Sequence, residues 1–239
     1  MMMMPTLPTR EHITGLVLAG GLGRRMGGVD KGLQAWRGQP LVQHVLARLA
    51  PQVGPLLINA NRHLHDYAAF GHPVVVDAAA GGDGAGVGAI SGSDGLPFAG
   101  PLAGMLAGLG TCTTPWLMCV PCDAPLLADD LVMRLCAAFA GQAGTRAAVV
   151  ISREADGSLQ PQPVFCLLHV GLRASLQAWI ATGQSKVMLW LRQQGCAQVV
   201  CDGGPAFFNT NTLDDLDRLN AVACASIPDS PRPNRATRP

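Results

Sequence analysis

Short apolar runs alternate along this chain with longer stretches of helical periodicity, and this alternation limits the fold more than any other feature. Such runs with a helix between them are typical of parallel strands buried beneath helices. We therefore expect an α/β fold, a three-layer sandwich with a mainly parallel sheet. The predicted strands are 13–19, 56–60, 74–77, 116–121, 147–152, 164–168 and 198–201, and the predicted helices are 41–50, 64–70, 101–109, 129–139, 171–182, 186–194 and 213–223.

The first predicted strand opens into a glycine-rich loop that carries three cations, Arg24, Arg25 and Lys31. Glycines allow backbone N–H groups to approach a ligand closely, and the cations add positive charge, which together suit a polyanion such as a triphosphate. An ordinary strand-to-helix turn with solvated arginines is the alternative interpretation. The glycines lie at positions 20, 21, 23, 27 and 28.

Two common nucleotide-binding motifs do not explain this loop. A dinucleotide fingerprint would place a third glycine where the chain has Met26. A P-loop requires Gly-Lys followed by Ser or Thr, and that sequence does not occur in the chain. An oxidoreductase that uses a nicotinamide cofactor is therefore disfavoured.

Polar residues follow the first four predicted strands. Gly20 follows the first strand, Asn59 and Asn61 end the second, Asp77 ends the third, and Asp123 follows the fourth. Singly, each is also a common turn-forming residue. Because ligands of open α/β sheets bind at the carboxyl ends of the strands, we expect these residues to line one crevice.

Composition excludes several classes of function. Charged residues make up 14% of the chain and the formal net charge is +1, which argues against a nucleic-acid-binding face. No apolar run reaches the ~18 residues of a membrane span, and no secretory signal is present. We expect a soluble, cytoplasmic protein with reduced cysteines and with no nucleic acid or membrane as a partner. Cys119 and Cys122 have no second pair at matching spacing, which disfavours zinc.

A single domain is predicted over 13–224. Residues 1–12 and the proline-rich tail 225–239 are predicted to be disordered, and the glycine-rich segment 78–99 is predicted to be a flexible loop.

Several short motifs together resemble the molybdenum cofactor guanylyltransferase family. They are LAGGLGRRMGGVDKGL (18–33), GQPL (38–41), NANR (59–62), Asp77, GPLAGM (100–105), PCDAP (121–125) and FNTNT (208–212). The likeness extends from about Ile13 to Ala223, and RRMGGVDKG is its most specific part. It implies a Rossmann-like nucleotidyltransferase fold and the transfer of GMP from GTP to molybdopterin, with release of pyrophosphate and formation of molybdopterin guanine dinucleotide.

The resemblance also implies roles for individual residues, with a nucleotide half at about 13–125 and a pterin half at about 126–224. Asp123 would bind Mg²⁺, with Mn²⁺ as an alternative, and would form the catalytic set with Lys31 and Arg25. The implied GTP contacts are Leu18, Ala19, Gly20, Gly21, Lys31, Asn59, Asp77 and Asp123, and the implied pterin contacts are Gly100, Pro101, Gly104, Lys186, Asn209 and Asn211. The implied partners are GTP, molybdopterin and, transiently, proteins that deliver or accept the cofactor.

The residues are compatible with this chemistry. A terminal phosphate is largely ionised at neutral pH and needs no general base, so the protein has to align two polyanions and neutralise their charge. A lone carboxylate such as Asp123 suffices to anchor Mg²⁺ when phosphates supply further ligands. Two alternatives stay open: a cytidylyl- or sugar-1-phosphate nucleotidyltransferase on the same fold, and a non-catalytic nucleotide-binding relative.

Overall fold

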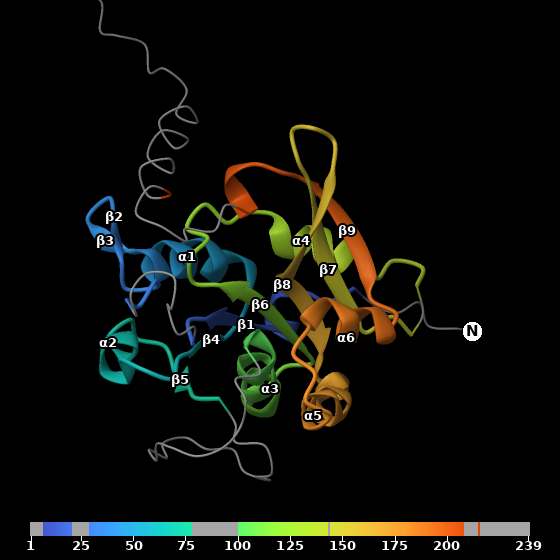
Figure 1. The fold of residues 1–239 in the computed structure, drawn as a ribbon, viewed down its shortest axis with the longest axis horizontal. Helices are drawn as coiled ribbons and strands as arrows, with labels where there is room; N and C mark the ends of the chain where they lie inside the picture. Colours follow the sequence, from blue (N-terminus) through green and yellow to red (C-terminus); the bar gives the residue numbers. More distant parts are fainter. Residues whose placement is uncertain (1–6, 21–28, 78–99, 143, 208–214, 216–239) are drawn as a thin grey trace, which may run out of the picture.

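A seven-stranded sheet runs through the part of the chain that the computed structural model describes, which is residues 7–20, 29–77, 100–142, 144–207 and 215 (Figure 1). The strands lie in the order β5-β4-β1-β6-β8-β7-β9. Each predicted strand is present, and the α/β class is confirmed. The strands are β1 (Ile13–Leu18), β4 (Leu56–Asn59), β5 (Val74–Val75), β6 (Trp116–Pro121), β7 (Ala147–Arg153), β8 (Leu159–His169) and β9 (Ala197–Asp202).

Parallel pairing brings the ends of four strands together. β5, β4, β1 and β6 are parallel neighbours, and Leu18 at the end of β1 lies between Asn59 of β4 and Pro121 of β6. β8 is antiparallel to both β6 and β7, and β9 is parallel to β7. After these two reversals β7 and β9 end at the same side of the sheet as β1, which we call the carboxyl edge, whereas β8 begins there.

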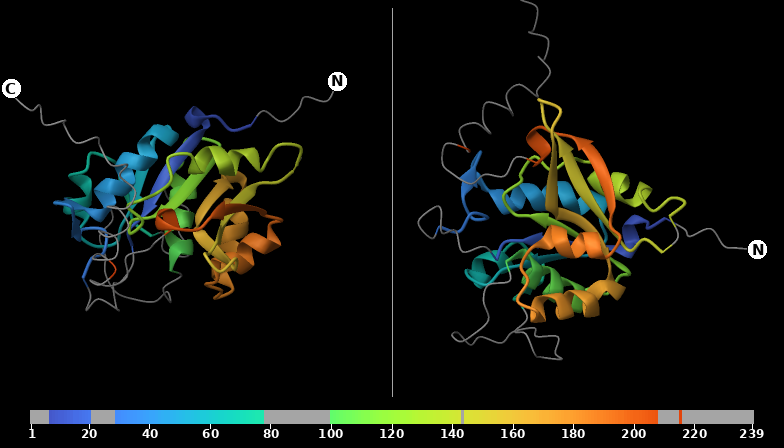
Figure 2. Two further views of the ribbon diagram at one scale, coloured as in Figure 1. Left: turned by 90° about the horizontal axis from the view of Figure 1, so that it is seen from above. Right: turned by 45° about the vertical axis from the view of Figure 1, so that its right-hand side comes forward.

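Helices cover both faces of the sheet and complete the predicted three layers (Figure 2). Successive residues of β1 point to opposite faces: Val17 enters the core beneath α1 and α4, and Leu16 enters the core beneath α3, α5 and α6. The helices are α1 (Leu41–Leu49), α2 (Leu64–Ala68), α3 (Pro101–Thr111), α4 (Leu131–Ala137), α5 (Arg173–Ala181) and α6 (Val187–Gln193), with 3-10 turns η1 (Arg10–His12), η3 (Ala50–Gln52), η4 (Val170–Leu172) and η5 (Pro205–Phe207).

β8 is longer than predicted, because it begins at Leu159 and not at residue 164. Prolines at 161 and 163 disfavour a strand, since proline offers no N–H to a neighbouring strand. The structure accommodates them in a hairpin with β7 that contains a bulge: Val149 lies opposite Cys166, whereas the next residue, Val150, lies opposite Gln162. Proline 163 therefore falls within the bulge.

A small hairpin, β2 (Ala35–Trp36) with β3 (Gln39–Pro40), was not predicted. Its turn residues Arg37 and Gly38 both have positive φ, 50° and 79°, as a two-residue hairpin turn of this kind requires. Arginine is uncommon in that conformation, so the sequence lacks the usual Asn-Gly signal. The Arg37 guanidinium lies 4.8 Å from the centre of the Trp36 ring, which offsets part of the strain.

Residues 10–12, which the sequence analysis placed in a disordered segment, form a 3-10 turn, and the Arg10 side chain donates to the carbonyl of Val53 at 2.7 Å. The predicted loop 78–99, the tail 225–239 and, apart from Asp215, the predicted helix 213–223 lie outside the described residues. Among the described helices, none combines the length and the apolar character needed to cross a bilayer.

Two glycines of α3 provide a test of how closely this helix approaches the sheet. A Cβ at Gly108 would lie 2.5 Å from a methyl of Leu16 and 3.0 Å from a methyl of Leu117, both fully buried. We expect Gly108→Ala to lower the free energy of unfolding by about 1–3 kcal/mol, because overpacking outweighs the better helix propensity of alanine.

Gly110→Ala is the matched control for this substitution. A Cβ at Gly110 would meet only the Arg173 guanidinium, at 3.6 Å, so alanine there should stabilise the protein by up to about 1 kcal/mol. Urea unfolding of both variants measures the difference. Equal effects of the two substitutions would contradict the close packing of α3 on β1 and β6.

Candidate active site

Lys31 and Asp123, which are 92 residues apart in the sequence, meet at the carboxyl edge. The Lys31 Nζ lies 3.5 Å from the Asp123 Oδ2, and the two side chains are 23% and 13% exposed. Both therefore keep a route to solvent while being largely enclosed by protein. A cation and a carboxylate held in this way can approach a phosphate chain from two directions.

Burial is the main influence on Asp123. It raises the pKa of the carboxyl above the ordinary value, and the Lys31 ammonium opposes that rise without cancelling it. Burial therefore disfavours the charged form of Asp123, and a nearby positive charge such as a metal ion would stabilise that form. Oxygen donors of this type suit Mg²⁺.

Asp123 is the residue predicted to bind a metal. Within the described ranges there is no cluster of three or more His, Cys, Asp or Glu side chains suited to a metal. One carboxylate completed by phosphate oxygens and water is, however, a common way of binding Mg²⁺. The site fits a metal that arrives with a phosphorylated substrate.

Asp77 forms a second polar group at this edge. Its Oδ1 accepts from Asn59 Nδ2 at 2.9 Å and its Oδ2 accepts from Asn61 Nδ2 at 2.8 Å, while its backbone N–H donates to Asn61 Oδ1 at 2.9 Å. Burial raises the pKa of Asp77, and the two amides oppose the rise. These bonds fix the ends of β4 and β5 relative to each other.

The backbone approaches these amides closely at two glycines. A Cβ at Gly20 would lie 2.8 Å from Asn61 Nδ2 and 3.1 Å from Asn59 Oδ1. A Cβ at Gly104, in the first turns of α3, would collide with Asn59 Oδ1 and lie 2.6 Å from Leu18 Cδ2. Gly104, which the sequence analysis assigned to the pterin, therefore lies against a predicted nucleotide contact.

Three other predicted residues lie at the same edge. Gly100 precedes α3 with φ of +57°, a conformation that favours glycine, and Pro101 occupies the first turn of the helix. Lys186 is exposed and immediately precedes α6. Because α6 leads through a short turn into β9, which ends at the carboxyl edge, α6 begins on that side of the sheet.

Known proteins with similar sequences also indicate a nucleotidyltransferase. Residues 15–199 match the model of the MobA-like NTP transferase domain. A molybdenum cofactor guanylyltransferase of Cupriavidus taiwanensis is 47% identical over 208 residues, covering 87% of this chain and 96% of the relative. Another, from Methylibium petroleiphilum, is 49% identical over 211 residues with the same coverage.

This chain belongs to the molybdenum cofactor guanylyltransferase family. Solved structures agree on the nucleotidyltransferase fold. A molybdopterin-guanine dinucleotide biosynthesis protein A from Archaeoglobus fulgidus superposes with a TM-score of 0.62 at 20% identity, over 90% of this chain and all of that one. A 2-C-methyl-D-erythritol 4-phosphate cytidylyltransferase from Thermus thermophilus gives 0.60 at 15% identity, over 87% and 98%.

For this guanylyltransferase family member, the structure leaves part of the predicted site untested. Gly21, Arg25, Asn209 and Asn211 lie outside the described residues, so their roles stay predictions. The described members nearest one another are Leu18, Ala19, Gly20, Asn59, Asp77 and Gly104 on one side and Lys31 with Asp123 on the other.

Sequence reasoning missed two buried residues beside Lys31. The Tyr67 hydroxyl, from α2, donates to Asp30 Oδ1 at 2.5 Å, and the backbone N–H of Gly32 donates to the same oxygen at 3.1 Å. Tyr67 is the single tyrosine of the chain, which could have drawn attention to it. Asp30 lies inside a motif that was interpreted through its glycines and its cations.

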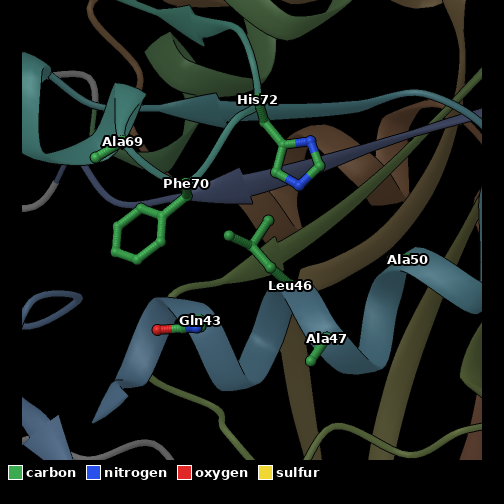
Figure 3. A pocket seen from close by; sticks show the side chains of 7 residues that line it. All are labelled: Gln43, Leu46, Ala47, Ala50, Ala69, Phe70 and His72. Carbon is green, nitrogen blue, oxygen red and sulfur yellow. The ribbon is translucent and has the colours of Figure 1, made fainter.

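A separate hollow lies between α1 and the segment after α2, and Figure 3 shows its lining. Phe70 and His72 lie on one side of it, and Leu46 points toward them from α1 on the other side (Figure 3). None of the predicted site residues is among its lining, so it does not extend the guanylyltransferase site. The lining residues are Gln43, Leu46, Ala47, Ala50, Ala69, Phe70 and His72.

The raised pKa of Asp123 predicts a pH-dependent stability. The folded state binds this proton more tightly than the unfolded chain, so the contribution of Asp123 is most favourable below the unfolded pKa. It is lost as the pH rises from the unfolded value through the raised folded value. We expect Asp123→Asn to be more stable than the wild-type protein at neutral pH and to lack that decline.

Urea unfolding at a series of pH values checks this expectation. Asp66→Asn is the control, since the Asp66 side chain is 57% exposed and its change should stay within about 0.5 kcal/mol. If Asp123→Asn is instead less stable than wild type at neutral pH, attraction to Lys31 outweighs the burial of the carboxylate.

Proposed function

We propose that the chain transfers GMP from GTP to the terminal phosphate of molybdopterin, with release of pyrophosphate and formation of molybdopterin guanine dinucleotide. The contact between Lys31 and Asp123 at the carboxyl edge carries this proposal. It joins a cation and a carboxylate at the place where open α/β sheets bind ligands. The names of the relatives support guanine as the base and molybdopterin as the acceptor.

On this proposal the residues of the chain act by charge and by position. The Lys31 ammonium lies against the phosphates of GTP and offsets their negative charge. Asp123 would hold Mg²⁺, with Mn²⁺ as an alternative, and the metal when bound would neutralise charge on the α-phosphate and the leaving pyrophosphate. The attacking phosphate is ionised at neutral pH, so none of the described side chains has to remove a proton.

The nucleotide is proposed to lie along the end of β1. Leu18, Ala19 and Gly20 lie there, and the close approach of Gly20 to Asn59 and Asn61 leaves no room for a larger residue. Asn59 and Asp77 are proposed as further GTP contacts, supported by their position at the ends of the two neighbouring strands. Gly21 and Arg25 complete the proposed set.

The acceptor is proposed to lie at the beginnings of α3 and α6. Gly100 and Pro101 lead into α3, and Gly104 brings that helix against Asn59, which supports a pterin held next to the nucleotide. Lys186, ahead of α6, is proposed to bind the pterin, together with Asn209 and Asn211. Transient contacts with proteins that deliver or accept the cofactor are part of the same proposal.

Direct assay separates this function from the closest alternative. Incubation of the protein with GTP, Mg²⁺ and molybdopterin should give a product whose mass exceeds that of molybdopterin by one GMP residue, with one pyrophosphate released per product. CTP in place of GTP is the control for a cytidylyltransferase. Product from CTP and none from GTP would contradict the choice of base, and binding of GTP without pyrophosphate release would indicate a non-catalytic relative.

Asp123→Ala should separate turnover from binding. We expect kcat to fall by about 10²–10³, the range found when one electrostatic stabiliser of a transition state is removed. The affinity for GTP should fall by less, since the other nucleotide contacts remain. Steady-state kinetics and calorimetric titration with GTP measure the two quantities, with Asp66→Ala as an exposed control. Equal losses in both would contradict a role centred on the transition state.

A further inference from the structure

Tyr67 and Asp30 form a buried contact that the proposed mechanism does not use. Tyr67 is fully buried, Asp30 is 7% exposed, and the phenol donates to Asp30 Oδ1 at 2.5 Å. The same oxygen accepts from the backbone N–H of Gly32 at 3.1 Å. The Asp30 Oδ1 therefore links α2, through Tyr67, to the backbone of Gly32, the residue after Lys31.

Further hydrogen bonds fix the backbone on both sides of Lys31. The carbonyl of Asp30 accepts from Gln34 Nε2 at 3.1 Å, and the carbonyl of Lys31 accepts from the Gln34 backbone N–H at 3.1 Å. The carbonyl of Gly32 accepts from the N–H of Val42, at the start of α1, at 2.9 Å. These hydrogen bonds fix the position of the Lys31 backbone, from which the side chain extends toward Asp123.

The backbone at Gly32 packs closely against Tyr67 and Cys122. A Cβ at this position would collide with the Tyr67 hydroxyl and lie 3.2 Å from the Sγ of Cys122, the residue that precedes Asp123. The Tyr67 hydroxyl, the Lys31 segment and the Asp123 segment are therefore in contact through Gly32. Burial, with Cys122 and Asp30 nearby, raises the pKa of Tyr67, so the phenol keeps its proton and remains a donor.

We propose that Tyr67 and Asp30 are positioning residues, whose buried hydrogen bond sets the direction of Lys31 toward Asp123 and the triphosphate. The part that concerns the triphosphate rests on the proposed function. The bond itself joins two groups that the proposed mechanism places on neither the phosphates nor the metal. Its effect would pass through the backbone of residues 30–32 to a single ammonium group.

The chain is well suited to a test that needs no catalysis, because Lys31 and Lys186 are its only lysines. Brief acetylation followed by mass spectrometry gives the ratio of modification at Lys31 to that at exposed Lys186, which serves as the internal reference. In Tyr67→Phe, which removes only the hydroxyl, release of Lys31 from Asp123 should raise this ratio by about tenfold, as expected for the loss of one buried hydrogen bond.

Thr14→Val is the matched control. Thr14 is also buried, its hydroxyl lies 2.8 Å from that of Thr114, and it stands near the opposite end of β1. Its removal should destabilise the protein to a similar degree and leave the ratio unchanged. An unchanged ratio in folded Tyr67→Phe, or an equal rise in both variants, overturns the inference.

Kinetics give a second measurement. In Tyr67→Phe we expect the KM for GTP to rise by about tenfold, with Thr14→Val like wild type. Asp30→Ala removes the acceptor and should raise the KM at least as much as Tyr67→Phe does, and the double variant should be no worse than Asp30→Ala, because the bond is already absent from it. A purely structural bond would lower the unfolding midpoint in each variant while KM stayed constant, which overturns the inference.

The two proposals can fail separately. If the wild-type protein forms no product from GTP and molybdopterin, the proposed function fails, whereas the acetylation ratio still decides whether the Tyr67–Asp30 bond directs Lys31. If Tyr67→Phe does not fold, the ratio in Asp30→Ala decides. If neither variant folds, the bond is required for folding and the positioning role is rejected.

Discussion

Two backbone hydrogen bonds at the end of β1 determine where everything else at the site can lie. The N–H of Ala19 donates to the carbonyl of Asn59 at 2.7 Å, and the carbonyl of Leu18 accepts from the N–H of Cys122 at 3.1 Å. They keep β4, β1 and β6 in register up to the last residues of the three strands. Because the strands are buried on both faces, this alignment cannot slip without exposing the core.

Three aspartates lie near the same edge, and each carboxylate has a different set of partners. Asp30 is bound by a phenol and a backbone N–H, and Asp77 by two amides. Both are satisfied by neutral donors. Asp123 is paired with a cation instead, and burial raises its pKa, as it raises the pKa of Asp77. The three carboxylates thus differ in their partners, and Asp123 is the one that lies beside a lysine suited to a phosphate.

Much of this arrangement could be predicted from the sequence because parallel strands convert distant positions into neighbours. The apolar runs located the strands, and the rule that ligands bind at carboxyl ends then predicted that Asn59, Asp77 and Asp123 lie at one edge. The contact of Asp123 with Lys31 followed from the same topology and from the family resemblance. Roles of individual residues within that edge remain predictions.

The features that were missed depend on interactions without a periodic signal. Tyr67 reaches Asp30 from a helix 37 residues away, and no local pattern announces such a pair. The β2–β3 hairpin has Arg37 where Asn or Gly is usual, and the early start of β8 is disguised by its prolines. In each case a tertiary contact overrides a local preference.

The reversed direction of β8 separates the sheet into two parts that can change independently. Its first residues pair with β7 alone, since pairing with β6 extends only from Cys166 to His169. The turn at 154–158 therefore projects at the carboxyl edge without taking part in the alignment of β1, β4 and β6. A change in this hairpin would therefore leave the paired ends of β1, β4 and β6 as they are.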